Sequence, residues 1–341
     1  MTFRVALIGS GNISETHARA AIEARHVELV AHWGRNAEAT QRLAQQCGGR
    51  AFGTLDELLA HRPLDAVLIG TPSGTHADFA IAAARAGLHV LVEKPLDITT
   101  ARIDPLLGEC ARANVTLGVF LQDRTAPDLV WLKQAIDRGD LGAPLLASAS
   151  VRWYRSPEYY AESPWRGTRA LDGGGALMNQ GIHTVDLLLW LFGPVARVWA
   201  VAKTVLHRIE VEDTVVATLE FANGAVGNLE VTTAAYPGLP RRIELTGSRG
   251  TVVVEGDRLL TWALEQPPAL EPPHHAGSTN ASATSPVVSD VTGHRRVLED
   301  FVAAVRGRRP PRCDGAEGRR SVALIEAIYQ SAEAHAPVVI Q

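Results

Sequence analysis

The first third of the sequence alternates short apolar runs with amphipathic segments, and this alternation restricts the fold more than any other feature. The runs are rich in β-branched and other apolar residues, whereas the segments between them have a helical spacing of apolar residues. The predicted strands cover residues 3–8, 27–33, 66–70, 89–93 and 116–121, and the predicted helices cover 13–25, 37–46, 76–86 and 100–113. Strands joined by single helices pair in parallel, so we expect an α/β fold with a doubly wound parallel sheet.

A glycine-rich turn, GSGNIS at residues 9–14, follows the first predicted strand and precedes the first predicted helix. This context is typical of a dinucleotide-binding turn, in which helix amides receive the pyrophosphate. Gly9 would permit the tight turn, and Gly11 would let the backbone approach the phosphates. Asn12 would cap the helix, and Ser14 stands where glycine or alanine is usual but is small enough for close packing. We expect the cofactor to be bound by Gly9, Gly11, Asn12 and Ile13.

The end of the second predicted strand, HWGRN at 32–36, bears on the choice of cofactor. NAD sites normally place a carboxylate there to hold the 2′-hydroxyl of adenosine, whereas arginine accommodates the 2′-phosphate of NADP. The first acid after this strand is Glu38, and Arg35 is placed to pair with a phosphate. We therefore slightly favour NADP over NAD, with Trp33, Arg35 and Asn36 in the adenosine site. If Arg35 only stacks on adenine, either cofactor would serve.

Composition and charge exclude several other classes of protein. The chain has 341 residues and a formal net charge of −4, so nucleic-acid binding is not expected. No apolar run approaches about 18 residues, and the N-terminus lacks the pattern of a signal peptide, so we expect a cytoplasmic protein without membrane contact. The three cysteines fit neither a disulfide framework nor a zinc pattern. His274 and His275 have no third ligand at a useful spacing, so no metal site is expected.

The rest of the chain has a different organisation, in which the strand-like runs cluster and, from residue 195 on, follow one another without helices between them. Such an order favours antiparallel pairing, and the runs cover residues 145–153, 195–205, 214–221, 225–233, 242–247 and 251–255. Asn223-Gly224, between two of these runs, indicates a tight hairpin. Residues 266–290, rich in proline, serine, alanine and histidine, are expected to form a loop or a partly disordered insertion. Helices over 295–305 and 318–333 are expected to pack back across both domains.

Two further strings end predicted strands at the carboxyl edge of the first sheet: GTPSGTH at 70–76 and VEKPL at 92–96. With the 9–14 turn and a glycine-rich helix signature at 173–186, they make essentially the whole chain resemble the glucose–fructose oxidoreductase/inositol dehydrogenase/MocA-like family. The resemblance implies an N-terminal Rossmann domain, residues 1–122, that binds NAD(P). It also implies a C-terminal α+β domain, residues 123–341, with an open, mostly antiparallel sheet for substrate binding and oligomerisation into a homodimer or homotetramer. Further cofactor-binding residues implied by the resemblance are Thr71, Pro72, His76, Glu93, Lys94 and Gln122.

The same resemblance implies that Lys94 hydrogen-bonds the reacting hydroxyl and lowers its pKa. If residues 176–192 form one helix, Asn179, His183 and Asp186 share one face of it. His183 titrates near neutrality and can accept the hydroxyl proton, while Asp186 would orient its other ring nitrogen or else cap a neighbouring loop. Many catalytic members of the family have aspartate at position 179, whereas sugar-nucleotide-type members with asparagine are known. Asn179 cannot accept a proton but can still hydrogen-bond a substrate.

Aromatic and basic residues precede this helix in two strings, RWYRSPEYY at 152–160 and WRGT at 165–168. Aromatic rings can cover the C–H faces of a sugar, and arginine or tyrosine can bond its oxygens or a carboxylate. We expect a sugar or polyol substrate to be bound by Tyr154, Trp165 and Arg166, together with Lys94, Asn179 and His183. Trp153 and Tyr160 could instead serve only as packing in the sheet.

The sequence therefore predicts an NAD(P)-dependent oxidoreductase, with Lys94 and His183 as acid/base groups. It would transfer a hydride between nicotinamide and a ring secondary alcohol or ketone of a sugar, cyclitol or sugar derivative. Two alternatives stay open. A non-catalytic dinucleotide or sugar sensor would be expected to lack Lys94 or His183, and both are present. An NAD-dependent glycosidase would use a transient hydride transfer without net redox change.

Overall fold

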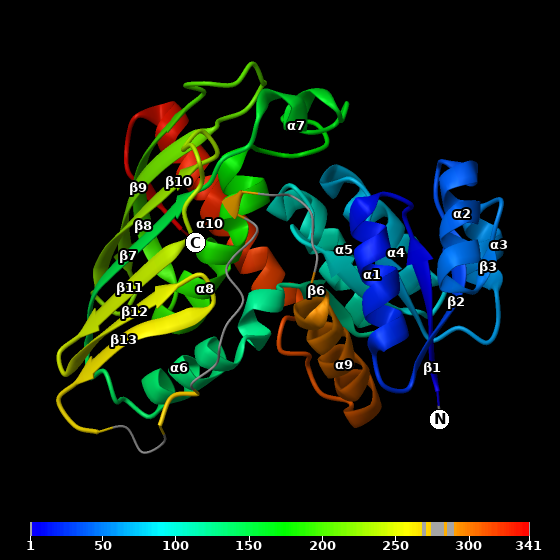
Figure 1. The fold of residues 1–341 in the computed structure, drawn as a ribbon, viewed down its shortest axis with the longest axis horizontal. Coiled ribbons are helices and arrows are strands. Elements are labelled where there is room, and N and C mark those ends of the chain that lie inside the picture. Colours follow the sequence, from blue (N-terminus) through cyan, green and yellow to red (C-terminus); the bar gives the residue numbers. More distant parts are fainter. Residues whose placement is uncertain (1, 268–270, 274–282, 285–289, 341) are drawn as a thin grey trace. The chain divides into compact units, whose positions relative to one another are not determined.

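The chain folds into two compact units in the computed structural model (Figure 1), which describes residues 2–267, 271–273, 283–284 and 290–340. The first unit comprises residues 1–122 and 287–319, and the second comprises 123–286 and 320–341. Most of the loop expected at 266–290 lies outside the described residues, as do His274 and His275. None of the described helices has the length and apolar character needed to cross a membrane.

The first unit is built on a six-stranded sheet in which every neighbouring pair is parallel, so the predicted parallel sheet is confirmed. Its spatial order is β3-β2-β1-β4-β5-β6, and the strands are β1 (Phe3–Ile8), β2 (Val27–Trp33), β3 (Arg50–Ala51), β4 (Ala66–Ile69), β5 (His89–Glu93) and β6 (Leu117–Phe120). The chain reverses its direction of winding between β1 and β4. In such sheets the crevice outside the carboxyl ends of these two strands is where ligands bind.

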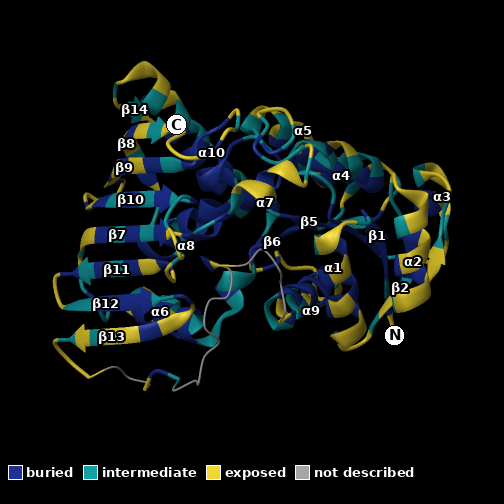
Figure 2. Ribbon diagram, turned by 45° about the horizontal axis from the view of Figure 1, so that its top comes forward, coloured by how far each residue is buried: buried dark blue, intermediate teal, exposed yellow. Residues whose placement is uncertain are grey.

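Helices cover both faces of this sheet (Figure 2): α4 and α5 pack together on one face, and α1 and α9 on the other. The helices of the unit are α1 (Asn12–Glu23), α2 (Ala37–Cys47), α3 (Leu55–Ala60), α4 (His76–Arg85), α5 (Thr100–Ala113) and α9 (Thr292–Gly307). Phe301 of α9 lies in the same buried cluster as Val5 and Leu91 of the sheet. The sequence did not predict β3 and α3, because two and six residues are too few for a periodic pattern.

The second unit contains an eight-stranded open sheet that is antiparallel except for the pair β7–β10, which confirms the predicted mostly antiparallel sheet. Its order is β13-β12-β11-β7-β10-β9-β8-β14, and its strands are β7 (Pro144–Arg152), β8 (Val195–Lys203), β9 (Thr214–Phe221), β10 (Val226–Thr232), β11 (Arg242–Gly247), β12 (Gly250–Glu255), β13 (Arg258–Leu264) and β14 (Val338–Val339). The predicted hairpin joins β9 and β10, where Gly224 has a φ of +89°. Strands β13 and β14 were not predicted.

One face of this second sheet is covered by helices α6 (Pro127–Asp137), α8 (Ile182–Phe192) and the later part of α10 (Gly315–Ala334), as Figure 1 shows. Side chains along β9 accordingly alternate between buried and exposed positions. The prediction of one regular helix over 176–192 was wrong in its first part. Residues Ala176–Gly181 form a π-helical segment, η3, and α8 begins only at Ile182.

The irregular start of this helix has a local cause in Glu212, which lies just before β9. Its two carboxylate oxygens accept hydrogen bonds from the backbone N–H groups of Gly175 and Leu177, both at 2.9 Å, and the Tyr329 hydroxyl donates a third at 3.0 Å. A side chain at position 175 would collide with the Glu212 carbonyl, since a Cβ there would lie 1.7 Å from that oxygen. The glycine run at 173–175 therefore lets the chain enter η3 close to this buried carboxylate.

Candidate functional site

The turn after β1 has the geometry of an anion-binding loop. Gly9 has a φ of +126°, and a Cβ there would lie 2.5 Å from the Gly70 carbonyl oxygen. Ser14 donates its hydroxyl to the same carbonyl at 3.2 Å, which explains why a serine fits the third position of the motif. Gly11 is exposed, and a Cβ on it would have no described atom within 4 Å. Packing within the protein therefore does not demand glycine at position 11, whereas close approach of a ligand to the backbone would.

The first helix presents its N-terminus at this turn. The predicted cap was wrong: Gly11 is the N-cap, helix α1 starts at Asn12, and no side chain among the described residues caps it. The first amides of a helix have no partner within the helix, so this end offers N–H groups and the positive end of the helix dipole. Asn12 is exposed and Ile13 half-buried. The residues present fit a dinucleotide pyrophosphate.

The adenosine candidates follow β2 at the same edge of the sheet. Trp33 is half-buried and packs edge-on against Phe79, with ring centroids 5.4 Å apart. Asn36 accepts a hydrogen bond from the Ala39 N–H at 3.0 Å, so its side chain caps helix α2. Arg35, between them, is exposed at the carboxyl end of β2. Of these three side chains, Arg35 is therefore the one best placed to bind a 2′-phosphate.

His76 ties together the two loops that carry the family strings. Its Nε2 lies 2.8 Å from the Thr71 carbonyl oxygen, after β4, and its Nδ1 lies 2.7 Å from the Pro95 carbonyl oxygen, after β5. The ring is buried, and this burial lowers the pKa of His76. Lys94 lies next to Pro95, so the ring holds the backbone on which Lys94 is carried. His76 would therefore act on a cofactor site through these loops rather than by direct contact.

The remaining candidates of the first unit lie on the same carboxyl edge. Thr71 and Pro72 follow β4 and are half-buried, and Gln122 follows β6 and is also half-buried. The Thr71 hydroxyl accepts a hydrogen bond from the Thr75 hydroxyl at 2.9 Å. Thr71, Pro72, Lys94 and Gln122 thus follow the carboxyl ends of β4, β5 and β6, the edge of the sheet at which this fold binds its ligands.

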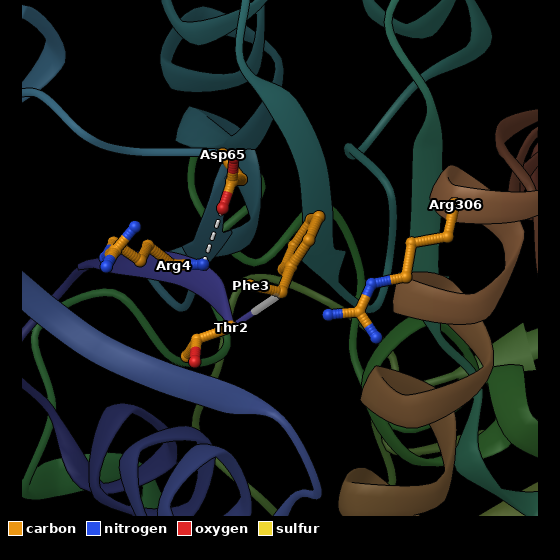
Figure 3. Close-up of a pocket in the computed structure, with 5 residues that line it drawn as sticks. All are labelled: Thr2, Phe3, Arg4, Asp65 and Arg306. Atoms are coloured by element: carbon orange, nitrogen blue, oxygen red, sulfur yellow. Dashed lines mark hydrogen bonds between the residues drawn. The ribbon is translucent and has the colours of Figure 1, made fainter.

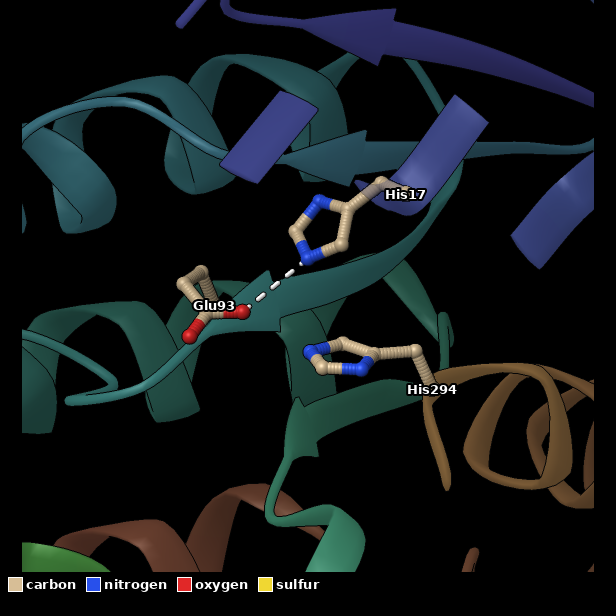
Figure 4. Close-up of side chains that lie close together, drawn as sticks. All are labelled: His17, Glu93 and His294. Atoms are coloured by element: carbon tan, nitrogen blue, oxygen red, sulfur yellow. Dashed lines mark hydrogen bonds and ion pairs between the residues drawn. The ribbon is translucent and has the colours of Figure 1, made fainter. Parts of the chain in front are cut away.

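Glu93 belongs to a buried group that the sequence did not predict (Figure 4). The His17 Nε2 lies 3.0 Å from a Glu93 carboxylate oxygen, and the His17 ring stacks on Phe120 with centroids 4.2 Å apart. His294 from α9 completes a set whose ligand-type atoms all lie within 4.8 Å of one another. Burial by itself raises the pKa of Glu93, but the hydrogen bond and charge of His17, with Lys94 and His294 nearby, lower it to about 2.

These three side chains are of types that bind metals, but the surroundings of His17 favour a different interpretation. A metal-bound histidine usually donates its second ring nitrogen to a carbonyl or carboxylate. The Nδ1 of His17 makes no hydrogen bond within the described part of the chain. We therefore interpret the group as a hydrogen-bonded pair of His17 and Glu93, with His294 beside it, that fixes Glu93 and, with it, the strand end before Lys94. No short-range pattern could have revealed it, because the two histidines lie on α1 and α9.

His183, on the first turn of α8 in the second unit, has a carboxylate partner that the sequence did not indicate. Its Nδ1 lies 3.6 Å from a carboxylate oxygen of Asp123, and the imidazole is buried. Asp123 also pairs with Arg241, which in turn pairs with Asp257. Arg241 is almost fully buried, and its Nε donates to the Gly256 carbonyl at 3.0 Å. The Asp123 carboxylate is therefore held in place beside the imidazole.

Asp186 has a structural partner instead. Arg124 donates to both of its carboxylate oxygens, through Nε at 2.7 Å and Nη2 at 2.6 Å, and the Ser321 hydroxyl lies 3.2 Å from one of them. The Arg124 guanidinium also lies 5.5 Å from the ring centroid of Trp190. Asp186 thus anchors α8 to the segment around Arg124, which is closer to the loop-capping alternative than to the orienting role for His183.

Asn179 lies in η3 and is half-buried. Its Nδ2 donates to one oxygen of Asp172 at 2.8 Å, and the other oxygen of Asp172 accepts from the Gly167 N–H, also at 2.8 Å. The next residue, Gln180, donates its side-chain amide to the Tyr159 hydroxyl at 3.2 Å. The short segment η3 therefore holds its polar side chains against the loop that precedes it.

Among the aromatic and basic candidates, Arg166 lies between Tyr159 and Trp165. The Arg166 guanidinium lies 4.3 Å from the Tyr159 ring centroid and 5.9 Å from that of Trp165, and it donates to the Tyr159 carbonyl at 3.0 Å. Arg166 and Trp165 are both half-buried. Tyr154 is also half-buried and packs edge-on against the exposed Tyr236. An arginine supported by aromatic rings in this way can receive a carboxylate or a sugar oxygen.

Two aromatic residues act as packing, as one of the alternatives had it. Trp153 is buried next to β7, and Tyr160 is buried with its hydroxyl 2.9 Å from that of Thr233. Burial raises the pKa of Tyr160 well above its ordinary value, so its hydroxyl stays protonated. The Tyr160 ring packs edge-on against that of Tyr159, with ring centroids 5.0 Å apart.

A separate hollow of about 570 Å³ lies elsewhere on the first unit (Figure 3). Its lining residues are Thr2, Phe3, Arg4, Asp65 and Arg306. The Arg4 N–H donates to the Asp65 carboxylate at 2.7 Å across it. The hollow lies at the amino end of β1, and Gly9 follows the carboxyl end of that strand. The hollow is therefore no part of the candidate site.

The fold and the turn first define a class of protein. A parallel sheet in this order, with a glycine-rich turn opening α1, is the Rossmann arrangement of dinucleotide-binding proteins. Comparison with known proteins then gives the family: residues 3–121 match the oxidoreductase family with an NAD-binding Rossmann fold, and residues 129–253 match the GFO/IDH/MocA C-terminal domain. The chain belongs to the GFO/IDH/MocA oxidoreductase family, as its motifs predicted.

Several relatives match nearly the whole chain. The WlbA dehydrogenase from Bordetella pertussis, solved in complex with NADH and UDP-GlcNAcA, is 35% identical, with 100% of this chain and 99% of that chain covered and a TM-score of 0.88. Inositol 2-dehydrogenase from Rhizobium meliloti is 28% identical, with 97% of each chain covered. D-xylose 1-dehydrogenase (NADP(+)) 2 from Haloferax volcanii is 29% identical, with 97% of this chain and 98% of that chain covered.

Proposed function

We propose that this protein is a nicotinamide-dependent dehydrogenase that takes a hydride from a ring secondary alcohol of a sugar derivative, or returns it to the ketone. The observation that carries the proposal is the similarity over the full length to a dehydrogenase solved with NADH and UDP-GlcNAcA. The strand-end residues Thr71, Pro72 and Lys94 support it, because they lie at the edge where this fold binds its cofactor. Nicotinamide, when bound, would supply the hydride acceptor.

Removal of a hydride from an alcohol also requires removal of the hydroxyl proton and stabilisation of the alkoxide. Lys94 is assigned to the hydroxyl: its ammonium group would donate to the oxygen and stabilise negative charge there. His183 is assigned as the base, because the Asp123 carboxylate, 3.6 Å from Nδ1, would stabilise the imidazolium that forms. Asn179 is assigned a hydrogen bond to the substrate. Both Lys94 and His183 are retained, which supports an enzyme over a sensor.

The cofactor preference follows from the end of β2. Arg35 is exposed there, and the first acid after it, Glu38, is paired with Arg42 at 3.0 Å. The first acid after the strand thus lies three positions beyond Arg35 and is paired with another arginine. We propose that NADP is accepted at least as well as NAD, as the name of the Haloferax volcanii relative also suggests.

We propose a sugar that carries a carboxylate and a nucleotide, of the UDP-GlcNAcA kind, as the first substrate to test. Arg166 is the supporting residue, because its guanidinium is half-buried between aromatic rings and suited to a carboxylate. A screen of UDP-GlcNAcA, myo-inositol and D-xylose against both cofactors, read at the nicotinamide absorbance, tests the proposal. Reduced cofactor should appear with UDP-GlcNAcA. A complete lack of reduction with all three, despite tight cofactor binding, would favour the sensor or the glycosidase.

A further inference from the structure

Asp172 lies between two N–H donors directly before the glycine run. One of its oxygens accepts from the Gly167 N–H and the other from the Asn179 Nδ2, both at 2.8 Å, and the side chain is buried. Gly167 has a φ of +70°, so the chain turns back on itself there and brings residues 167 and 172 together. The carboxylate therefore links this turn to the side chain of η3 that the family resemblance singles out.

This contact fixes which way the amide of Asn179 points. An ionised carboxylate can only accept hydrogen bonds. The Asn179 atom that faces Asp172 must therefore be Nδ2 and not Oδ1. The carbonyl oxygen Oδ1 is then the atom of the amide that can face a ligand. Without Asp172 the amide could present either its donor or its acceptor to that ligand.

We propose that Asp172 is a positioning residue that holds Asn179 with its carbonyl oxygen towards the substrate, where it accepts a hydrogen bond from a sugar hydroxyl or amide N–H. This inference rests on the proposed function. It also explains why position 179 carries asparagine: an aspartate there would place a second carboxylate at hydrogen-bond distance from Asp172. Two carboxylates so close cannot both ionise without a large cost.

Several charged and titratable groups surround Asp172. They are Arg155, Arg166 and Glu212, together with the tyrosines Tyr159, Tyr160 and Tyr329. Burial raises the pKa of all three tyrosines, so they stay neutral near neutral pH, and an arginine guanidinium stays charged. Burial also raises the pKa of Glu212, but Glu212 is present in wild type and variants alike. A pH dependence that appears only with a second carboxylate at position 179 would therefore belong to the pair 172/179.

The test is an exchange of the two side chains, measured as kcat/KM against pH with UDP-GlcNAcA, or with whichever screened sugar is turned over. In Asp172→Asn the new side-chain amide can present its own N–H donor to Asn179. The Asn179 amide then flips, and kcat/KM falls by about tenfold or more. In Asn179→Asp the activity should fall as pH rises, because the paired carboxylates repel. The double variant restores one carboxylate and one amide, since the amide at position 172 can accept from the Gly167 N–H and donate to the carboxylate at position 179. Its kcat/KM should recover to within about threefold of wild type.

A merely structural Asp172 would give a different result. The carbonyl of the new amide would still hold the Gly167 turn, so Asp172→Asn would keep its activity, and the exchange would be no better than the worse single variant. Either outcome overturns the inference. Should a variant fail to fold, by its melting temperature and NADH affinity, the effect of Asp172→Asn is measured in an Asn179→Ala background, where it should vanish.

The proposed function can fail separately. If wild type turns over none of the sugars, the affinity of UDP-GlcNAcA is measured by calorimetry in the same four proteins. A loss on Asp172→Asn that the exchange reverses would support the positioning of Asn179 even then. Equal affinities in all four proteins would overturn it.

Discussion

Arg124 donates two hydrogen bonds to Asp186, one to each carboxylate oxygen, at 2.7 and 2.6 Å, and both side chains are buried. Asp186 lies one turn after His183 on α8. The pair therefore fixes the helix that carries the proposed base. The spacing of His183 and Asp186 was compatible with a direct partnership or with a loop cap. The structure shows that Asp186 secures the helix through Arg124, while Asp123 lies beside the imidazole.

Removing Arg124 should destabilise the protein strongly. Arg124→Met would leave the Asp186 carboxylate buried without its bidentate partner, which costs about 3–5 kcal/mol. The matched control is Arg152→Met, because Arg152 pairs with Glu230 at 2.6 Å on the exposed surface, where such pairs contribute about 1 kcal/mol or less. Urea unfolding of both variants measures the difference. Equal losses would show that the buried pair does not anchor α8.

Glu93 should make the stability of the protein depend on acid pH. Its pKa is about 2 in the folded state against an ordinary value of 4.5, so the unfolded state binds the proton first as pH falls. The stabilisation, on the order of 3 kcal/mol, is present above pH 4.5 and lost as pH falls towards 2. Glu93→Gln should therefore be less stable than wild type at neutral pH, and the gap should close in acid.

The matched control for Glu93 is Glu38→Gln, whose side chain is exposed on α2 and pairs with Arg42. Its unfolding free energy should stay close to that of wild type throughout the pH range. A gap for Glu93→Gln that stayed constant with pH would mean that the carboxylate is not the source of the effect.

Arg35 should decide between the two cofactors. Arg35→Ala removes the exposed guanidinium at the end of β2, so NADP affinity should fall by about tenfold or more while NAD affinity changes little. Fluorescence titration with both reduced cofactors measures this. Arg208→Ala, which removes an exposed arginine of the second unit, serves as control and should leave the ratio of the two affinities unchanged. Equal losses for both cofactors in Arg35→Ala would remove the 2′-phosphate argument.

Lys94 should matter for turnover and not for cofactor affinity. Lys94→Ala removes the group assigned to the alcohol oxygen, so kcat should fall by about 10²-fold or more, while NADH affinity should stay within about tenfold of wild type. Lys203→Ala, an exposed lysine at the end of β8, is the control. Normal turnover in Lys94→Ala would contradict its assigned role.

The sequence predicted most of the fold because its signals are local. The strands β1, β2 and β5 were predicted with the same bounds as the structure shows, since each is an apolar run ended by a turn signal. The turn at Gly9 and the motif around Lys94 can likewise be recognised from a few consecutive residues. Strand β3 and helix α3 were not predicted, because they are too short to show a periodic pattern of apolar residues.

The side chains that pair with His183 and Glu93 in the candidate site were not predicted for a different reason, which is their distance along the chain. Asp123 lies 60 positions before His183, and His294 comes from a helix far beyond Glu93. The contact of Asp172 with Asn179 is close in sequence, but it depends on the turn at Gly167 and on the π-helical start at Ala176. The regular helix that was predicted over 176–192 did not indicate this contact between Asp172 and Asn179.

Transfer of a hydride from a sugar ring to nicotinamide is the central claim, and isotope transfer tests it most directly. UDP-GlcNAcA and the other screened sugars, each deuterated at its ring carbons, are incubated with the protein and oxidised cofactor, and the nicotinamide is analysed by mass spectrometry. The account predicts reduced cofactor that carries one deuterium, in an amount matching the oxidised sugar. Reduced cofactor without deuterium, or no reduced cofactor with any of the sugars, would contradict it.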